Sequence, residues 1–265
     1  MLVHARAEIL ALAQKCTLTD LGSYDGWEAT LWRLDDDDVA LAIEAYRALL
    51  NAGMDDMTAL LLEDGIDLDE LLTGGTARDE ITRSDVTELI AAASMITGDG
   101  CHVDRMHMPN VPKMARGKSD SGIDVLDIRL DPEGSFDQLG DDERLVIGSV
   151  KHTVGDSTSQ MRYALAKTLG SKELSTGYLA RQLRTVHHRL VEQGLDRVRA
   201  NRLMLFVRDF YKNSAVRLVA VGCADPSMED DLRGQLNNLP SVPNRPNGFR
   251  IVTVPDISSV HEDCP

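Results

Sequence analysis

Apolar residues recur at helical spacing in the first part of the chain. Val39 to Asn51 and Met54 to Glu63 both show this spacing, and Asp35 to Asp38 place four carboxylates ahead of the first predicted helix, where its positive end favours them. Consecutive carboxylates point in different directions, so we interpret the run as a solvated helix entry rather than a metal site. A turn-forming cluster, Leu72 to Thr76, then interrupts the helical pattern and predicts a domain boundary.

Further along, the pattern alternates between helical and extended stretches. Ser84 and the apolar run after it predict a capped helix, and Cys101 to Met108 predict a short extended segment. Gly122 to Leu130 and Arg144 to His152 are rich in β-branched and apolar residues and are separated by a strong turn signal, so we expect them to pair as antiparallel strands. The other expected elements are helices over about Ser157–Leu169, Thr176–Gln193 and Asp196–Tyr211, and strands over Val216–Cys223 and Phe249–Val254.

This order of elements predicts an α/β (α+β) fold with a central mixed sheet flanked by helices. The turn-forming cluster divides the chain into an acidic helical region over residues 1–76 and a larger domain over residues 77–265. A length of 265 residues is enough for one sizeable core with a smaller helical domain beside it.

Charge is divided unevenly along the chain. Residues 1–100 hold 6 Lys and Arg against 21 Asp and Glu, which accounts for the whole formal charge of −15, whereas residues 101–265 hold 22 of each. Within the second part, residues 151–215 contain 12 basic and 5 acidic residues. Because nucleic acids bind largely through such basic side chains, the acidic total does not exclude a nucleic-acid partner for the C-terminal part.

Several classes of protein are disfavoured by the sequence. The longest apolar run is far shorter than the roughly 20 residues that cross a bilayer, and the first residues do not follow the pattern of a secretory signal, so we expect a cytoplasmic protein with no membrane partner. The four cysteines are scattered, which predicts free thiols rather than disulfides or a structural zinc site. No phosphate-binding loop or dinucleotide fingerprint occurs, so neither ATP nor a dinucleotide is indicated.

The candidate chemistry lies in the two central strands. Because side chains alternate across a strand, Ser149 and Lys151 share one face, and Asp124 shares the face of Leu126 on the neighbouring strand. A lysine on an otherwise apolar strand face needs a negative partner, which Asp124 or a phosphate could supply. Lysine is also common as a protective residue on edge strands, so Lys151 alone leaves both interpretations open.

At these residues the sequence resembles the PD-(D/E)XK nuclease superfamily, whose pattern is an acid on one strand and acid-x-Lys on the next, between a helix that often offers Glu and one that often offers Gln. The matching residues are Asp124 in SDSGIDVLDIRLD, Lys151 in LVIGSVKHT, Glu88 on the preceding helix and Gln160 on the following one. The resemblance covers roughly residues 78–255 and implies a restriction-endonuclease-like sheet. Within the superfamily, the sequence looks most like the nuclease subunit of Hachiman-type antiphage defence systems.

The resemblance implies hydrolysis of phosphodiester bonds with Mg²⁺ or Mn²⁺, with Asp124 as a metal ligand and Lys151 as the catalytic cation. One departure is that Ser149 fills the family's second carboxylate position, and a neutral hydroxyl binds Mg²⁺ more weakly than a carboxylate does. Glu88 is the best remaining acid for a second metal ligand, although a solvent-facing helical Glu is the other interpretation. Gln160 completes the candidate catalytic set.

Basic helices follow the candidate site. Their cations could line a groove that contacts phosphates without identifying bases. These residues are Lys172, Arg181, Arg184, Arg189, Arg197, Arg199, Arg202 and Arg208. Acidic residues are interspersed, so a solvated helix surface is the other interpretation.

The combined expectation is a metal-dependent DNA nuclease of prokaryotic antiviral defence, acting with a helicase subunit that the resemblance implies. The alternative is a catalytically silent, nuclease-like module that binds DNA or a partner, and Ser149 is its chief support. An RNA substrate also stays open.

Overall fold

The computed structural model describes most of the chain. The described residues are 5–49, 75–108, 123–131, 133–135, 137–153, 180, 183–184, 186–188, 191, 197–208, 215–239, 247–258 and 260.

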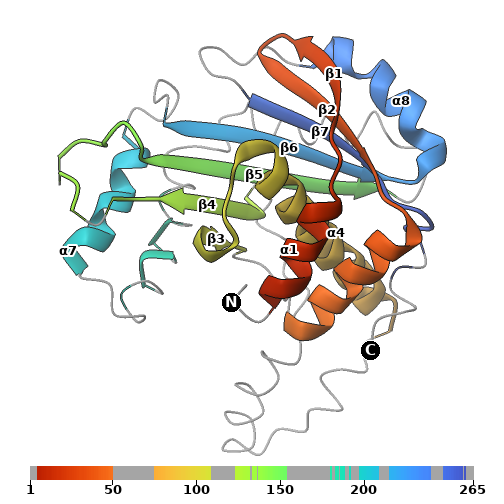
Figure 1. The fold of residues 1–265 in the computed structure, drawn as a ribbon, viewed down its shortest axis with the longest axis horizontal. Coiled ribbons are helices and arrows are strands. Elements are labelled where there is room, and N and C mark those ends of the chain that lie inside the picture. Colours follow the sequence, from red (N-terminus) through yellow and green to blue (C-terminus); the bar gives the residue numbers. More distant parts are fainter. Residues whose placement is uncertain are drawn as a thin grey trace, which may run out of the picture.

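The centre of the fold is a seven-stranded mixed sheet with the order β1-β2-β7-β6-β5-β4-β3 (Figure 1). The four strands β2, β7, β6 and β5 run parallel, and the outer pairs β1–β2, β5–β4 and β4–β3 are antiparallel. The bounds are β1 Thr19–Tyr24, β2 Trp27–Arg33, β3 Met106–His107, β4 Val125–Arg129, β5 Arg144–Thr153, β6 Val216–Ala224 and β7 Asn247–Thr253.

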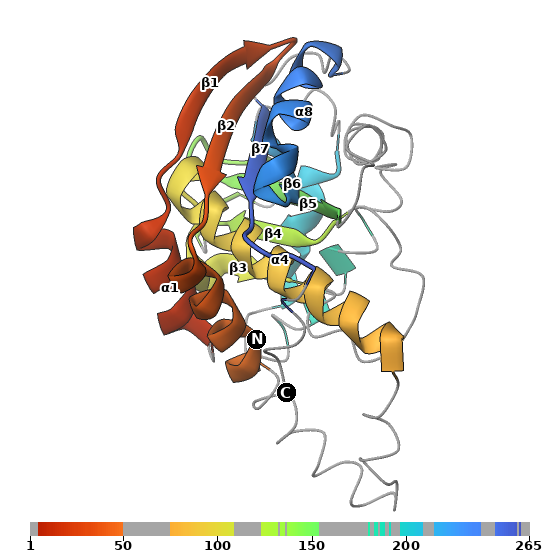
Figure 2. The same ribbon diagram turned by 90° about the vertical axis from the view of Figure 1, so that its right-hand side faces the viewer.

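Helices flank both faces of the sheet, which confirms the expected mixed α/β architecture. On one face lie α1 (Arg6–Lys15), the helix over 36–49 and α4 (Gly75–Asp99), and on the other lies α8 (Glu229–Gly234), as Figure 2 shows. The second face is also covered by α7 (Arg197–Ala200) and the 3-10 helix η4 (Asn201–Phe206). The described residues also form the short 3-10 helices η2 (Val103–Arg105), η6 (Pro226–Met228) and η7 (Leu236–Asn238).

Two hydrophobic cores follow from the alternation of side chains along the buried strands. On β5, Val146 and Val150 join the core beneath α1 and α4, whereas Leu145 and Ile147 join the core beneath η4 and α8. The sheet is therefore buried on both faces at its centre.

Several predicted elements are confirmed with shifted bounds. The antiparallel pair β4–β5 is present in one register, with Val125 opposite Gly148, and β6, β7 and the helix over 36–49 lie where the pattern placed them. The predicted helix start at Ser84 is wrong, because α4 begins at Gly75 and Ser84 lies inside it. We expected the carboxylates of Asp35 to Asp38 to be solvated, but Asp38 is buried. Its backbone N–H donates to the Asp35 carboxylate over 2.9 Å.

The N-terminal region contains strands as well as helices, whereas we expected it to be helical. Residues 19–33 form the hairpin β1–β2, and β2 pairs in parallel with β7 of the same sheet. The missed signal is the dipeptide Asp25-Gly26, whose φ angles of 47° and 90° are those of a tight hairpin turn. The division of the chain at residue 76 stays a prediction, since 50–74 lies outside the described residues, as do the predicted helices over 54–63 and 157–169.

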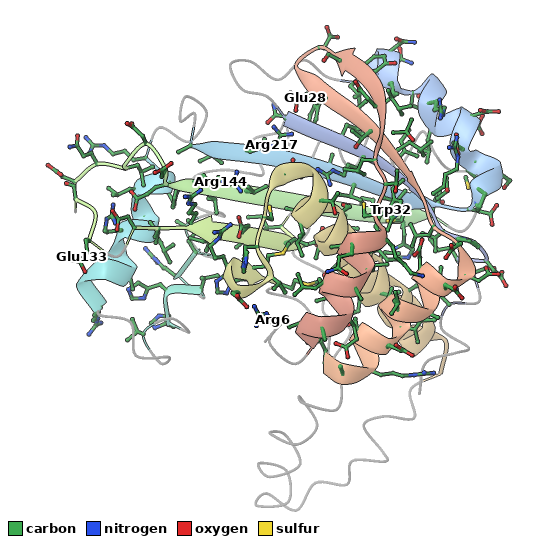
Figure 3. All side chains as sticks on the ribbon, viewed as in Figure 1. Arg6, Glu28, Trp32, Glu133, Arg144 and Arg217 are labelled. Carbon is green, nitrogen blue, oxygen red and sulfur yellow. The ribbon has the colours of Figure 1, made fainter. Side chains whose placement is uncertain are left out.

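The C-terminal end of α4 is held to the sheet by a buried network of charges. Asp99 Oδ1 lies 2.8 Å from Arg217 Nε in an ion pair, and Asp99 Oδ2 accepts from the guanidinium of Arg250, which also donates to the carbonyl of Ser94. Arg217 in turn pairs with Glu28 at 2.8 Å, and Figure 3 shows these two labelled side chains close together. The network therefore joins α4, β6, β7 and β2.

A second buried ion pair fixes the connection between β4 and β5. The Arg202 guanidinium on η4 lies 2.6 Å from the Glu143 carboxylate, and both side chains are almost fully buried. Glu143 also accepts from the backbone N–H groups of Asp131 and Gly140. In the part of the chain that the structure describes, no helix is both long and apolar enough to cross a membrane.

Candidate functional site

Asp124 lies at a bend immediately before β4, against the middle of β5. Its backbone N–H donates to the Gly148 carbonyl over 2.9 Å, and its Oδ2 accepts from the Val150 N–H over 2.6 Å. The residue is 4% exposed. The carboxylate thus takes the place of a backbone acceptor for β5, which fixes it relative to the strand that carries Ser149 and Lys151.

The bend changes the direction in which Asp124 points. We expected its side chain on the face of Leu126, but Ile123 packs in the core beneath η4 while Val125 packs in the core beneath α4. In an unbroken strand these two residues would share a face, so the alternation is interrupted at Asp124. Its carboxylate instead reaches along the hydrogen-bonding direction of the sheet toward the β5 backbone.

Ser149 and Lys151 occupy alternate positions of β5, on the side that faces the η4 core. Ser149 is fully buried, and no described residue forms a hydrogen bond with its hydroxyl. Lys151 is half-buried, and the described residues include no ion pair for its ammonium group. The residues beside them on β6 are Ala220 and Gly222, which carry little or no side chain.

Glu88 lies on α4 and is 2% exposed, so the solvent-facing interpretation is wrong for this residue. Its carboxylate accepts from the Ser84 hydroxyl over 3.4 Å. A side chain at Gly148 would contact the sulfur of Met95, so α4 crosses β5 at this point. Glu88 lies two helical turns before Met95, which is about 10 Å along the helix axis.

The position of α4 sets the side from which Glu88 approaches. The helix covers the face of Val125 and Val150, whereas Ser149 and Lys151 point to the opposite face. Ser149 and Lys151 thus point to one side of β5, and the Asp124 carboxylate lies against the β5 backbone between them. Glu88 lies on the helix across the sheet from Ser149 and Lys151.

The other predicted residues are less informative. Gln160, Lys172, Arg181 and Arg189 lie outside the described residues. Arg184 is described, helical and exposed, next to the buried Leu183, which is consistent with a phosphate-contacting surface and equally with a solvated one. Arg202 is corrected: it is buried and paired with Glu143, so it does not line a basic groove.

A metal ion at this site would rely on few protein ligands. Among the described residues, no group of three or more His, Cys, Asp and Glu side chains lies close enough to hold a metal. The oxygen atoms that could bind a metal are those of the Asp124 carboxylate and the Ser149 hydroxyl, which forms no hydrogen bond with a described residue. Both are hard oxygen donors, and Mg²⁺ in proteins is commonly held by one or two carboxylates together with water and substrate phosphates, so the donors fit Mg²⁺ bound in that way.

Comparison with known proteins adds no relative to this picture: no model of a protein family matches the sequence, and no curated protein matches it.

Proposed function

We propose that this chain is a metal-dependent nuclease that hydrolyses phosphodiester bonds in DNA, with a restriction-endonuclease-like arrangement of its sheet. The observation that supports the proposal is the position of Asp124. Its carboxylate accepts from the N–H of Val150, the residue between Ser149 and Lys151, so an acid immediately before β4 lies beside the antiparallel strand that carries the lysine. The resemblance to PD-(D/E)XK nucleases implies an acid beside the strand that carries the lysine, although here the Asp124 side chain turns to the β5 backbone rather than to the expected face.

Each residue would have a separate task. Asp124 and Ser149 would hold Mg²⁺ or Mn²⁺, whereas Glu88, on the helix across the sheet from Ser149, is left out of this ligand set. The bound metal would polarise the phosphate that is attacked. The hydrogen bond from the Val150 N–H orients the Asp124 carboxylate, as bonds to metal-ligating carboxylates commonly do. The ammonium of Lys151 would stabilise the negative charge that develops on the phosphate.

The remaining parts of the proposal concern partners. Arg184, with Lys172, Arg181 and Arg189, would contact phosphates of the DNA backbone. Action in antiviral defence together with a helicase subunit rests on the resemblance stated above.

The test is a comparison of variants that remove one chemical group each. Lys151→Ala removes the ammonium, and Asp124→Asn removes the carboxylate charge while its amide oxygen can still accept from the Val150 N–H. Arg129→Ala is the matched control, because Arg129 is an exposed cation at the opposite end of β4. Cleavage of linear and circular DNA and of RNA is measured with Mg²⁺ and with Mn²⁺, and thermal melting checks the fold of each variant.

We expect Lys151→Ala and Asp124→Asn to lower the rate of DNA cleavage about 100-fold or more at an unchanged melting temperature, and Arg129→Ala to leave it unaltered. Folded Lys151→Ala protein that cleaves as fast as the original would refute the assigned site. Cleavage of RNA alone would show that the substrate class is wrong.

A second candidate, a catalytically silent module that binds DNA, is favoured by one observation: Ser149 is neutral where the family has an acid. It predicts no cleavage by the unaltered chain under any of these conditions, with DNA binding retained in a gel-shift assay.

A further inference from the structure

We propose that a groove between the helix over 36–49 and the turn at 255–258 binds a basic segment of a partner protein that also carries aliphatic side chains. The groove is distant in sequence from the candidate nuclease site, and the proposal does not depend on phosphodiester hydrolysis. It encloses about 370 Å³ and is lined by Asp36, Val39, Ala40, Ile43, Glu44, Arg47, Pro255, Asp256 and Val260.

One wall of the groove is a single stripe of the helix. Residues 36, 39, 40, 43, 44 and 47 follow the spacing of three and four residues that places side chains on one helical face. The stripe runs from residue 36 to residue 47, and these eleven steps along the helix correspond to about 16 Å at the helical rise. Its length suits roughly five residues of extended chain, at about 3.3 Å each.

The opposite wall is held in place by contacts with the rest of the fold. Asp256 has a φ of 47°, a left-handed conformation that Asp adopts more readily than most residues, and its carboxylate accepts from the Ser258 hydroxyl over 3.1 Å. The Ser258 carbonyl accepts from Arg83 on α4 over 2.9 Å. The turn is therefore tied to the helix that underlies the groove.

The floor of the groove is apolar. Val39, Ile43 and Val260 are at most 9% exposed and belong to the core beneath α4. A partner's aliphatic side chain in this groove would cover Ala40, which is exposed on the helix surface. Apolar contact of this kind supplies affinity in proportion to the area that leaves water.

The rim is acidic and sets the charge of the occupant. Asp36, Glu44 and Asp256 contribute three carboxylates against the one guanidinium of Arg47, a net charge of minus two. This field repels a nucleic acid or a phosphate and attracts lysine and arginine, which favours a cationic segment over either.

The experiment measures binding of a fluorescein-labelled peptide of alternating leucine and lysine by fluorescence anisotropy, with a leucine–glutamate peptide of equal length as the control ligand. Glu44→Lys reverses a rim charge, and Ala40→Phe fills the groove without changing charge. Asp37→Lys is the matched control, because Asp37 is exposed on the same helix and lies outside the lining.

We expect Glu44→Lys and Ala40→Phe each to weaken binding of the basic peptide at least tenfold, Asp37→Lys to change it less than twofold, and the acidic peptide not to bind. Equal weakening by Glu44→Lys and Asp37→Lys would show a diffuse charge effect and overturn the proposal. Binding of duplex DNA, or self-association of the chain, that is abolished by Ala40→Phe would assign the groove to a different occupant and overturn it as well.

Discussion

The buried carboxylate of Asp99 is expected to be one of the most sensitive positions for stability. It is the acidic partner of Arg250, whose side chain is 3% exposed and whose pKa is lowered by burial. Removing one member of a buried ion pair typically costs about 3–5 kcal/mol, because the remaining charge keeps its desolvation penalty. Arg250 retains one neutral acceptor, the Ser94 carbonyl, so we expect Asp99→Asn to cost about 3 kcal/mol, near the low end of that range.

The measurement is urea unfolding followed by circular dichroism, with the free energy of unfolding extrapolated to water. Glu28→Gln is the matched control, since it breaks the exposed end of the same network, where Glu28 is 55% exposed, and exposed pairs contribute about 0–1 kcal/mol. The double variant Asp99→Asn with Arg250→Met should recover part of the loss, because no unpaired charge then stays buried. A cost for Asp99→Asn no larger than that for Glu28→Gln would refute the reasoning.

Two further outcomes are expected. Gly148→Ala should lower the free energy of unfolding by about 1–3 kcal/mol, because the added Cβ would lie 2.8 Å from the sulfur of Met95. Met95→Ala should reduce that cost in the double variant, whereas additive losses in urea unfolding would contradict the contact. The pKa of Glu229 is held below its ordinary value, mainly by hydrogen bonds from Arg33 at 2.6 and 2.7 Å. Because the lowered pKa belongs to the folded state, this pair stabilises the fold above the ordinary carboxyl pKa, and its contribution is lost as pH falls through the lowered pKa. Arg33→Gln should raise the Glu229 pKa in an NMR titration, and an unchanged titration would contradict the pairing.

The central strands could be predicted because their signals are local. β4 and β5 each carry a run of apolar and β-branched residues with a turn between them, and their antiparallel pairing follows from that order alone. The start of α4 was misplaced because Ser84 resembles a helix cap, and only the packed structure shows that the helix continues through it. The hairpin β1–β2 was missed because its exposed residues give β1 little apolar alternation.

The candidate site was predicted as a set of residues but not as a geometry. Alternation placed Ser149 and Lys151 correctly on one side of β5, since nothing interrupts that strand. It failed for Asp124, where a bend turns the carboxylate toward a backbone amide, and a bend of this kind has no clear signal in the sequence. The side from which Glu88 approaches depends on how α4 packs, which is a property of the whole sheet.

The parallel pairing of β2 with β7 has a consequence for how the protein is made. Trp27 lies opposite Asn247, so β2 cannot pair with β7 until the long stretch of chain between them has been synthesised. Until then the first hairpin has one side of β2 open to strands of other nascent chains. Synthesis of β7, rather than emergence of the first hairpin, therefore sets the moment at which the sheet can close.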